Sequence, residues 1–564
     1  MDKITTPSVN CQINENGEVE QRLGYLDTGW NLNEANKRSG PPYYMKKYDV
    51  TFLAINTKVY YIDHNNGDAI VNTGLTLTAN TRTRIDEYEG DVYLTNVTDG
   101  LFRIVVGRLN GATSAGGNIT VDRDMAARLS VFGLTTGTVR IGGTGETYTG
   151  VTVSSGALTA TSSAAYTDNA IAIRTQDIST SREKGSKVFF WKRRMGIIGS
   201  IVADNADQPN NTVFYGQFST PQALELIIDY TYGTGGSTRE QVGNYGSVTN
   251  VIPAKDYLYQ FTQDEAYITG ADDVTLSGTG IGTTTPDLRD RDHGCLNEDS
   301  AASMGDDEIA YITSDKRIMR IRISTESGAA VVYPDESFDL PMRNLLKDMN
   351  DDQTGALAYH WKGGGKTIFQ VRISGQWYWL VYDNRIKAWQ PPWQIRTVSG
   401  FFERQGVLYG VDYSDDTIFS FFTSFADNGS PIDSKIVTGD FDIRDGMIKE
   451  VETAGLISWA AKIRLQAHVT NQRGGRRSGS EKNILGSAFT YSDEDFSVGA
   501  IRGGGAGVTA ETTMVAAWKK SFDVFPSEAN RVQLTVSQSE EGGYFRLSSY
   551  AIHYVPYRHF AASA

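Results

Sequence analysis

The stretch SGQWYWLVYDNRIKAWQPPWQ, from Ser374 to Gln394, contains four tryptophans and poses a choice between a binding surface and a packed sheet. In a β-strand, successive side chains point to opposite faces, so Trp377 and Trp379 share one face while Tyr378 and Leu380 share the other. Both faces are then apolar, which is typical of a strand buried on two sides.

The rest of this stretch predicts a hairpin. Asp383 and Asn384 form a turn sequence, and the chain then returns through Ala388 and Trp389 before two prolines end the strand. We interpret the tryptophans as packing residues of one sheet among many. The alternative is an aromatic platform that grips a sugar or a base.

The same pattern of short apolar runs between polar turns recurs along the chain. Residues 50–63 predict two strands around a turn at Asn56, and residues 84–96 predict two strands around Glu89-Gly90. Further hairpins begin at Lys187, Lys255, Asp307, Thr367 and Gly400. Seven such units predict small sheets repeated around an axis, which is a β-propeller, and a stack of β-sandwiches is the alternative.

Changes in composition and strand pattern divide this all-β chain into predicted domains. Residues 1–106 and 176–436 are predicted to form the β-propeller, while residues 107–175, rich in Thr, Ser, Ala and Gly, predict an inserted small β-domain between two hairpins. Residues 437–564 hold six longer alternating strands, which predict a C-terminal β-sandwich. The best short helix candidates are residues 221–230 and 341–350, each opened by proline.

Composition limits the classes of function. The chain has 564 residues, a formal net charge of -14 and a pI near 5.1, which argues against general affinity for duplex DNA because phosphate binding needs clustered Lys and Arg. Cys11 and Cys295 are its two cysteines, too few for a disulfide framework, so we expect folding in a reducing place. With no signal-peptide pattern and no apolar run of 18 residues, we expect a soluble chain without a membrane span.

One polar cluster could pass for a site. The segment DRDHGCLNEDS, residues 290–300, brings together several groups that could act in catalysis or bind a metal: Asp290, Asp292, His293, Cys295, Glu298 and Asp299. A loop this rich in turn-forming residues is usually only solvated, and we favour that interpretation.

The remaining segments do not match known ligand-binding or catalytic motifs. Residues 360–367, HWKGGGKT, resemble a phosphate-binding loop, but His360 replaces its first glycine and a strand follows, so we expect a hairpin turn. Residues 14–18 lack the spacing of an EF-hand, and no nucleophile elbow or sialidase box is present. We expect His468 and His553 to be structural histidines in strands. We therefore predict no catalytic residues, no metal and no cofactor, and the sequence leaves any binding residues unknown.

The order of elements carries a resemblance to a known family. The motifs are PYYMKKYDV with KVYYID, then EGDVYLTNVTDGLFRI, SKVFFWKRRMG leading to NTVFYGQFSTPQAL, and near the end KIRLQAHVT, AAWKKSFDV and NRVQLTVSQSEEGGYFRLSSYAIHY. With these motifs in this order, the chain resembles the tail nozzle proteins of short-tailed bacteriophages, which include packaged-DNA stabilisation proteins. The insertion at residues 107–175 departs from the simplest members.

The resemblance implies a structural virion protein without enzymatic activity. It implies a homohexameric tube at the distal end of the phage tail, assembled in the host cytoplasm. This tube would contact a tail adaptor and a tail fibre or spike. It would retain the packaged DNA and let it pass during ejection without specific binding. We expect carboxylates toward the lumen to limit adhesion of DNA. The basic segments 191–194 and 473–477 are expected to be subunit contacts or solvated tips. The alternative function is a glycan-binding or glycan-cleaving β-propeller, such as a receptor-binding tail protein.

Overall fold

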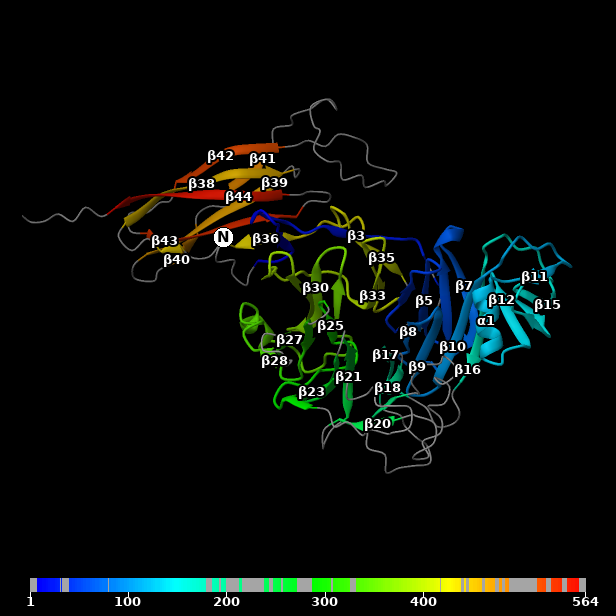
Figure 1. The fold of residues 1–564 in the computed structure, drawn as a ribbon. Coiled ribbons are helices and arrows are strands. Elements are labelled where there is room, and N and C mark those ends of the chain that lie inside the picture. The colour runs from blue at the N-terminus through cyan, green and yellow to red at the C-terminus, as the bar shows by residue number, and fades with distance from the viewer. Residues whose placement is uncertain are drawn as a thin grey trace, which may run out of the picture. The chain divides into compact units, whose positions relative to one another are not determined.

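The computed structural model forms many antiparallel β-sheets (Figure 1). It describes residues 8–556 apart from residues 31, 33–39, 80, 179–184, 192–193, 199–211, 216–237, 243–246, 255–256, 271–286, 306–307, 325–330, 416, 438–440, 443–445, 459–461, 472–475, 479–481, 486–514, 524–528 and 540–544. The chain divides into two compact units. Unit 1 comprises residues 1–28, 364–396 and 419–564, and unit 2 comprises residues 29–363 and 397–418.

Unit 2 is a series of small sheets that follow one another along the chain. The first holds β4 (Tyr43–Met45), β5 (Val50–Ile55), β6 (Lys58–Asp63) and β7 (Ala69–Thr76), and the second contains β8 (Arg84–Tyr88), β9 (Asp91–Asn96), β10 (Gly100–Arg108) and β16 (Ile171–Asp177). The third holds β17 (Lys187–Trp191), β18 (Arg194–Ile198), β19 (Thr212–Tyr215) and β20 (Thr238–Gln241).

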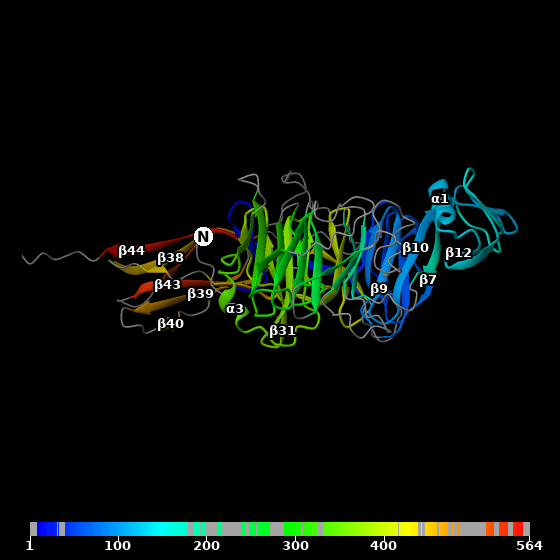
Figure 2. The same ribbon diagram turned by 60° about the horizontal axis from the view of Figure 1, so that its bottom comes forward.

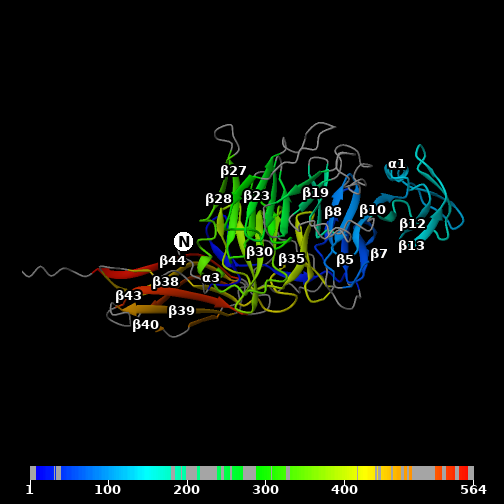
Figure 3. The same ribbon diagram turned by 90° about the horizontal axis from the view of Figure 1, so that it is seen from below.

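Two further sheets and three more strands complete unit 2. The fourth sheet holds β21 (Val248–Pro253), β22 (Tyr257–Thr262), β23 (Ala266–Gly270) and β24 (Asp287–Asp290), and the fifth holds β25 (Ala301–Ser303), β26 (Glu308–Ile312), β27 (Ile318–Ser324) and β28 (Val331–Asp335). Strands β29 (Leu357–Trp361), β33 (Val398–Arg404) and β34 (Val407–Asp412) follow. Seen from the edge, the sheets of unit 2 stand side by side (Figures 2 and 3).

Local sequence explains the hairpins. Strands β5 and β6 pair around Asn56, whose φ is 52°, and strands β8 and β9 pair around Glu89 and Gly90, whose φ values are 51° and 89°. Two consecutive residues with positive φ form the tight turn whose twist matches that of paired strands. All seven predicted hairpins are present as paired strands, β33 pairing with β34 in the last of them.

The core of unit 2 lies between neighbouring sheets. Val50 and Phe52 of β5 belong to one fully buried cluster with Leu94 of β9 and Ile104 of β10. Burial of each such side chain stabilises the fold by roughly 1.5–3 kcal/mol. A second cluster joins Phe261 of β22 to Tyr311 of β26, so adjacent sheets are held by apolar packing.

The inserted segment 107–175 connects two neighbouring strands of one sheet, β10 and β16. Strand β10 pairs with β16 from Phe102–Asp177 to Arg108–Ile171, so the chain leaves and re-enters at the same edge. The segment contains β11 (Asn118–Thr120), α1 (Arg123–Val131), β12 (Gly137–Ile141), β13 (Thr144–Tyr148), β14 (Val151–Thr152) and β15 (Ala157–Thr161). Strands β12 and β13 extend the sheet of β16, and the remainder protrudes from unit 2 (Figures 1 to 3).

Helix α1 is an element of this segment that the sequence analysis did not predict. Asp122 caps the helix by accepting a hydrogen bond from the Met125 amide at 2.7 Å. Arg128, on the buried face of α1, anchors it to the sheet by donating to the carbonyls of Gly90 and Val106, each at 2.6 Å. The insert therefore has its own apolar core and a fixed attachment.

Unit 1 holds the longest strands of the described chain, β38 and β44, together with several short ones. One sheet has the order β1 (Cys11–Ile13), β2 (Val19–Gln21), β44 (Phe545–Pro556), β38 (Gly446–Ser458) and β42 (Val515–Asp523). The other has the order β36 (Ser434–Val437), β43 (Ala529–Gln538), β39 (Lys462–Asn471) and β40 (Arg476–Ser478), with β37 (Phe441–Asp442) on β43 and β41 (Lys482–Leu485) on β39. Unit 1 also contains β3 (Gly24–Asp27), paired with β35 (Ile418–Ser424), and β30 (Lys366–Ile373), β31 (Gln376–Asp383) and β32 (Ala388–Trp389).

The N-terminal strand β2 pairs with the last strand of the described chain. Strand β2 pairs with the C-terminal strand β44 through Val19 and Leu547, so residues 1–28 group with the C-terminal strands and not with the rest of segment 1–106. The predicted helix 341–350 is reduced to α3 (Arg343–Leu346), and a 3-10 turn, η1, spans His64–Asn66. The helix predicted at residues 221–230 lies outside the described residues. In the described part of the chain, no helix has the length and apolar character to cross a membrane.

Candidate functional site

The first strands of successive sheets form a ring within unit 2. Strand β4 contacts β8, which contacts β17, which contacts β21, which contacts β25, which contacts β29, which contacts β33, and β33 contacts β4 again. All the ring strands belong to unit 2. A cavity of about 260 Å³, which we call the axial cavity, lies against this ring.

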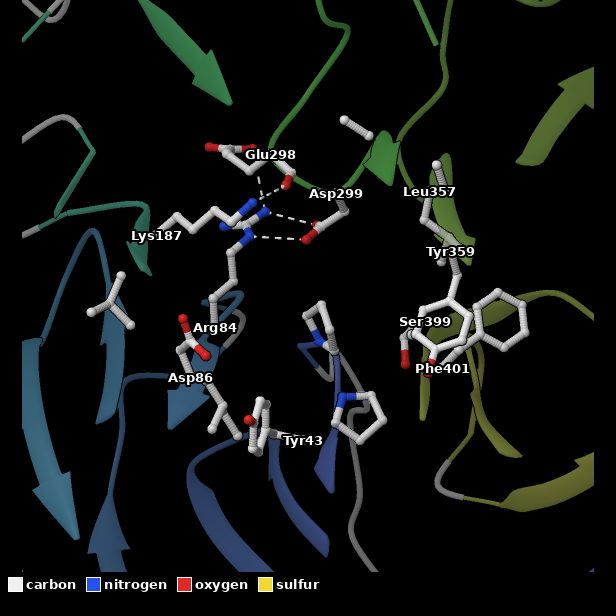
Figure 4. Close-up of a pocket in the computed structure, with 17 residues that line it drawn as sticks. Tyr43, Arg84, Asp86, Lys187, Glu298, Asp299, Leu357, Tyr359, Ser399 and Phe401 are labelled. Carbon is white, nitrogen blue, oxygen red and sulfur yellow. Dashed lines mark hydrogen bonds and ion pairs between the residues drawn. The ribbon is translucent and has the colours of Figure 1, made fainter. Parts of the chain in front are cut away.

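Six of the seven ring strands, all except β21, supply residues of the axial cavity from the strand itself or from the residues just before it. They are Pro41, Pro42 and Tyr43 at β4, Arg84, Ile85 and Asp86 of β8, Lys187 and Val188 of β17, Glu298, Asp299 and Ala301 at β25, Leu357, Ala358 and Tyr359 of β29, and Ser399, Gly400 and Phe401 of β33. Charged side chains gather on one wall, and aromatic rings of Tyr359 and Phe401 form the opposite wall (Figure 4).

A buried ion pair dominates the charged wall. Arg84 Nε donates to Asp299 Oδ1 at 3.0 Å and Arg84 Nη2 donates to Asp299 Oδ2 at 2.8 Å, which is bidentate geometry. Arg84 Nη2 also reaches Glu298 Oε2 at 3.2 Å, and Arg82 Nε lies 2.7 Å from Asp299 Oδ2. The loop before β25 is thereby tied to β8, over more than two hundred residues of sequence.

Neighbouring polar groups extend this network. Lys187 Nζ donates to Asn250 Oδ1 at 2.8 Å and to the Glu298 carbonyl at 3.3 Å. The Asn250 amide donates to the Asn297 carbonyl at 3.1 Å, and the Ala358 amide donates to the Asp299 carbonyl at 2.8 Å. Loop 296–300 thus joins β8, β17, β21 and β29 through hydrogen bonds, which indicates a structural role for its carboxylates.

The surroundings of the two aspartates of this wall shift their pKa values in opposite directions. Burial opposes ionisation of Asp299, but the charges of Arg82 and Arg84 and the Arg84 hydrogen bonds outweigh it and hold the Asp299 pKa well below its ordinary value. Burial raises the pKa of Asp86 to about 7. Burial also lowers the pKa of Lys187, and the opposing effect of Asp299 does not restore it.

The structure divides the predicted cluster of residues 290–300. Glu298 and Asp299 line the axial cavity, whereas His293 Nδ1 pairs with Asp290 Oδ2 at 3.0 Å and Asp292 is exposed at the surface. Burial raises the pKa of the Cys295 thiol, which disfavours the nucleophilic thiolate. Among the described residues, no group of three or more His, Cys, Asp or Glu side chains could hold a metal ion.

The tryptophan-rich stretch is packed, as predicted. Trp379 and Trp393 are fully buried, Trp389 is buried, and Trp377 is half-buried. Trp393 Nε1 donates to the Cys11 carbonyl at 2.7 Å, and Trp379 Nε1 donates to Gln370 Oε1 at 3.1 Å. A ring whose faces and N–H group are all occupied by protein cannot stack on a sugar.

The remaining motifs form turns and strands. Residues 362–365 form the predicted turn, followed by β30 rather than a helix, and Glu403 accepts from the Lys362 and Gly363 amides at 3.0 Å. Residues 14–18 form the turn between β1 and β2.

The histidine and basic-segment predictions are covered only in part. His468 lies in β39 and His553 in β44. Of segment 191–194, Trp191 is buried and donates to the Ala254 carbonyl at 3.1 Å, while residues 192–193 and 473–475 of the two basic segments lie outside the described residues.

The axial cavity itself was missed by sequence reasoning. Its charged residues come from separate hairpins, and the sequence of each hairpin by itself does not indicate a cavity. A weak signal exists, because Lys187 begins an otherwise apolar strand and Arg84 and Asp86 alternate with Ile85 in β8. Alternate residues of a strand share a face, which places Arg84 and Asp86 on the same side of β8.

Comparison with known proteins yields likenesses of structure alone. No family model matches the chain, and no curated protein matches its sequence. The crystal structure of the computationally designed Ika8 protein is 10% identical over 71% of this chain and 99% of its own, with a TM-score of 0.34. BamB from Moraxella catarrhalis is 9% identical over 74% of this chain and 95% of its own, with a TM-score of 0.31. Kluyvelomyces marxianus Hsv2 is 9% identical over 71% of this chain and 93% of its own, with a TM-score of 0.31.

Proposed function

We propose that the successive sheets are the blades of one seven-bladed β-propeller. The observation that supports it most is the cycle of contacts among β4, β8, β17, β21, β25, β29 and β33, in which the last strand returns to the first. In a propeller the first strand of each blade lines the axis, and radial repetition leaves only short sheet edges. A linear stack of β-sandwiches would leave its first and last strands apart.

We further propose that the chain is a structural virion protein, the tail nozzle of a short-tailed phage. The resemblance of its motifs to that family supports this function. The buried tryptophans and the ion-paired carboxylates of the axial cavity also favour a protein that works through shape rather than by a reaction. In this function the C-terminal strands form a β-sandwich platform.

The proposed working state is a homohexamer attached to a tail adaptor, with a tail fibre or spike as a further partner. Its lumen would retain the packaged DNA and then conduct it during ejection. The net charge of -14 supports this role, because like charge keeps DNA from adhering to a channel wall. Closed rotational symmetry generates such a tube from one repeated contact.

Negative-stain images and native mass of the purified full-length chain test the proposed function. We expect sixfold rings and a particle of six times the 61.9 kDa subunit mass. A monomer or trimer that binds or hydrolyses a polysaccharide would instead identify a glycan-binding or glycan-cleaving propeller. The packing of Trp379 and Trp393 argues for the first result.

A further inference from the structure

Within the described part of the chain, Asp86 of the axial cavity is a carboxylate without an ion-paired cation. Asp86 Oδ1 accepts a hydrogen bond from the Glu87 amide at 2.8 Å. Among the described residues, no lysine or arginine nitrogen lies within the 4.0 Å ion-pairing distance of the Asp86 carboxylate. A carboxylate removed from bulk water without a cation is unfavourable, so this group would gain from one.

The cations that line the axial cavity together with Asp86 are engaged elsewhere. Arg84 is held by Asp299 and Glu298, and Lys187 is held by Asn250 and the Glu298 carbonyl. Each of these contacts is itself needed to satisfy a partly buried polar group. Moving either cation to Asp86 would therefore leave another buried group unpaired.

The space beside Asp86 suits a small ligand with an apolar part. Tyr43 lies next to Asp86, and Tyr359 and Phe401 face it across the cavity (Figure 4). Aromatic faces attract ammonium and guanidinium groups, and they pack against short alkyl chains. The cavity volume of about 260 Å³ lies just below the roughly 300 Å³ at which pockets for drug-sized ligands begin.

We propose that the axial cavity binds a small organic cation, which is an ammonium or guanidinium group on a short apolar stem. The cation would pair with the Asp86 carboxylate beside the Tyr43 ring, and the stem would lie against Tyr359 and Phe401. The cation is carried either by a free amine or by a lysine or arginine side chain of a partner. This inference does not depend on the proposed function.

Binding of this kind depends on pH. Burial raises the pKa of Asp86 to about 7, so the carboxyl is largely neutral at pH 6 and largely ionised at pH 8. The charged groups that act on Asp86 are Lys187 of β17, which favours its ionisation, and Glu87 of β8, which opposes it. Tyr43 of β4 stays neutral in this range because burial raises its pKa. Binding should therefore strengthen between pH 6 and pH 8.

Calorimetric titration of the full-length chain with butylammonium tests the proposal. Phosphate is the buffer, because Tris is itself a small organic cation. At pH 8 we expect saturable binding of butylammonium and no binding of its neutral analogue butan-1-ol. Asp86→Asn should weaken binding about tenfold or more, since it removes a charge-assisted hydrogen bond.

A matched variant separates the cavity from surface charge. Asp264 is exposed in the turn between β22 and β23, so Asp264→Asn removes the same charge away from the cavity and should leave binding unchanged. Near-ultraviolet circular dichroism of both variants verifies their fold. Asp86→Asn should fold, because it replaces a carboxyl that burial already disfavours in its charged form.

A second ligand distinguishes the two sources of the cation. Nα-acetyl-lysine methylamide carries the same ammonium group on a peptide backbone. If it binds as tightly as butylammonium, the cavity accepts a side chain presented by a partner; if only butylammonium binds, the ligand is a free amine. Equal binding of butan-1-ol, no binding of either amine at pH 8, or unchanged binding by Asp86→Asn would each overturn the proposal.

Discussion

Two stretches invite a functional interpretation, and the structure treats them in opposite ways. Residues 374–394 are rich in tryptophan, and their indole rings are largely enclosed. Residues 290–300 are rich in charge, and two of their carboxylates line a cavity. Aromatic side chains here provide cohesion, whereas the charged side chains remain next to space that a ligand could enter.

The difference lies in how each stretch satisfies its polar atoms. The indole N–H groups of Trp379 and Trp393 are paired within unit 1, and the rings add apolar burial. The carboxylate of Asp299 is paired with two arginines, Arg84 in β8 and Arg82 just before that strand. A packed hairpin is complete by itself, while an ion-paired loop depends on partners brought together by the fold.

The largest expected effect is that of Trp393→Ala. This side chain is fully buried and donates to the Cys11 carbonyl, so truncation leaves a cavity and an unpaired acceptor. We expect a loss of about 3–5 kcal/mol in the free energy of unfolding, measured by urea denaturation. A loss below about 1 kcal/mol would contradict the packing interpretation.

The second largest expected effect is that of Asp299→Asn. We expect it to lower the free energy of unfolding by about 3 kcal/mol at pH 7, because Arg84 and Arg82 lose their shared carboxylate. The Asp299 pKa is held well below 3.8, so its contribution is complete above that pH and declines as the pH falls further. Denaturation at pH 7 and at pH 3 measures this. Equal stability of the variant and the native chain at pH 7 would refute a structural role.

Asp86→Asn should raise the free energy of unfolding at pH 8, whereas Asp299→Asn lowers it at pH 7. Burial raises the Asp86 pKa from 3.8 to about 7, so between these values the unfolded chain releases a proton that the folded chain keeps, and stability falls as pH rises. About 1.36 kcal/mol per pKa unit sets a ceiling near 4 kcal/mol, and partial solvation of the cavity reduces the gain to about 2 kcal/mol at pH 8. Thermal unfolding at pH 8 and pH 4 should show stabilisation only at pH 8; a destabilised variant would contradict this.

The smallest expected effect is that of Trp377→Ala. This ring is half-buried on β31, so its removal should cost about 1 kcal/mol or less. Urea denaturation beside Trp393→Ala checks the contrast between two tryptophans of one hairpin. Equal losses for the two variants would show that burial does not distinguish them.

The hairpins could be predicted because their information is local. Strand alternation and turn residues such as Asn56 and Glu89-Gly90 lie within a dozen residues of one another. The axial cavity could not, because Arg84 and Asp299 meet only after the sheets assemble. Helix α1 carried a readable cap at Asp122, but the surrounding Thr- and Ser-rich composition favoured strands. The pairing of β2 with β44 likewise depends on contacts that no local pattern encodes.

Electron cryomicroscopy of the purified full-length chain would show whether the first strands of the sheets close into a ring. We expect a map in which one cavity, lined by Asp86 and Asp299, is surrounded by β4, β8, β17, β21, β25, β29 and β33. A map in which the sheets lie in an open row, with β33 remote from β4, would contradict it.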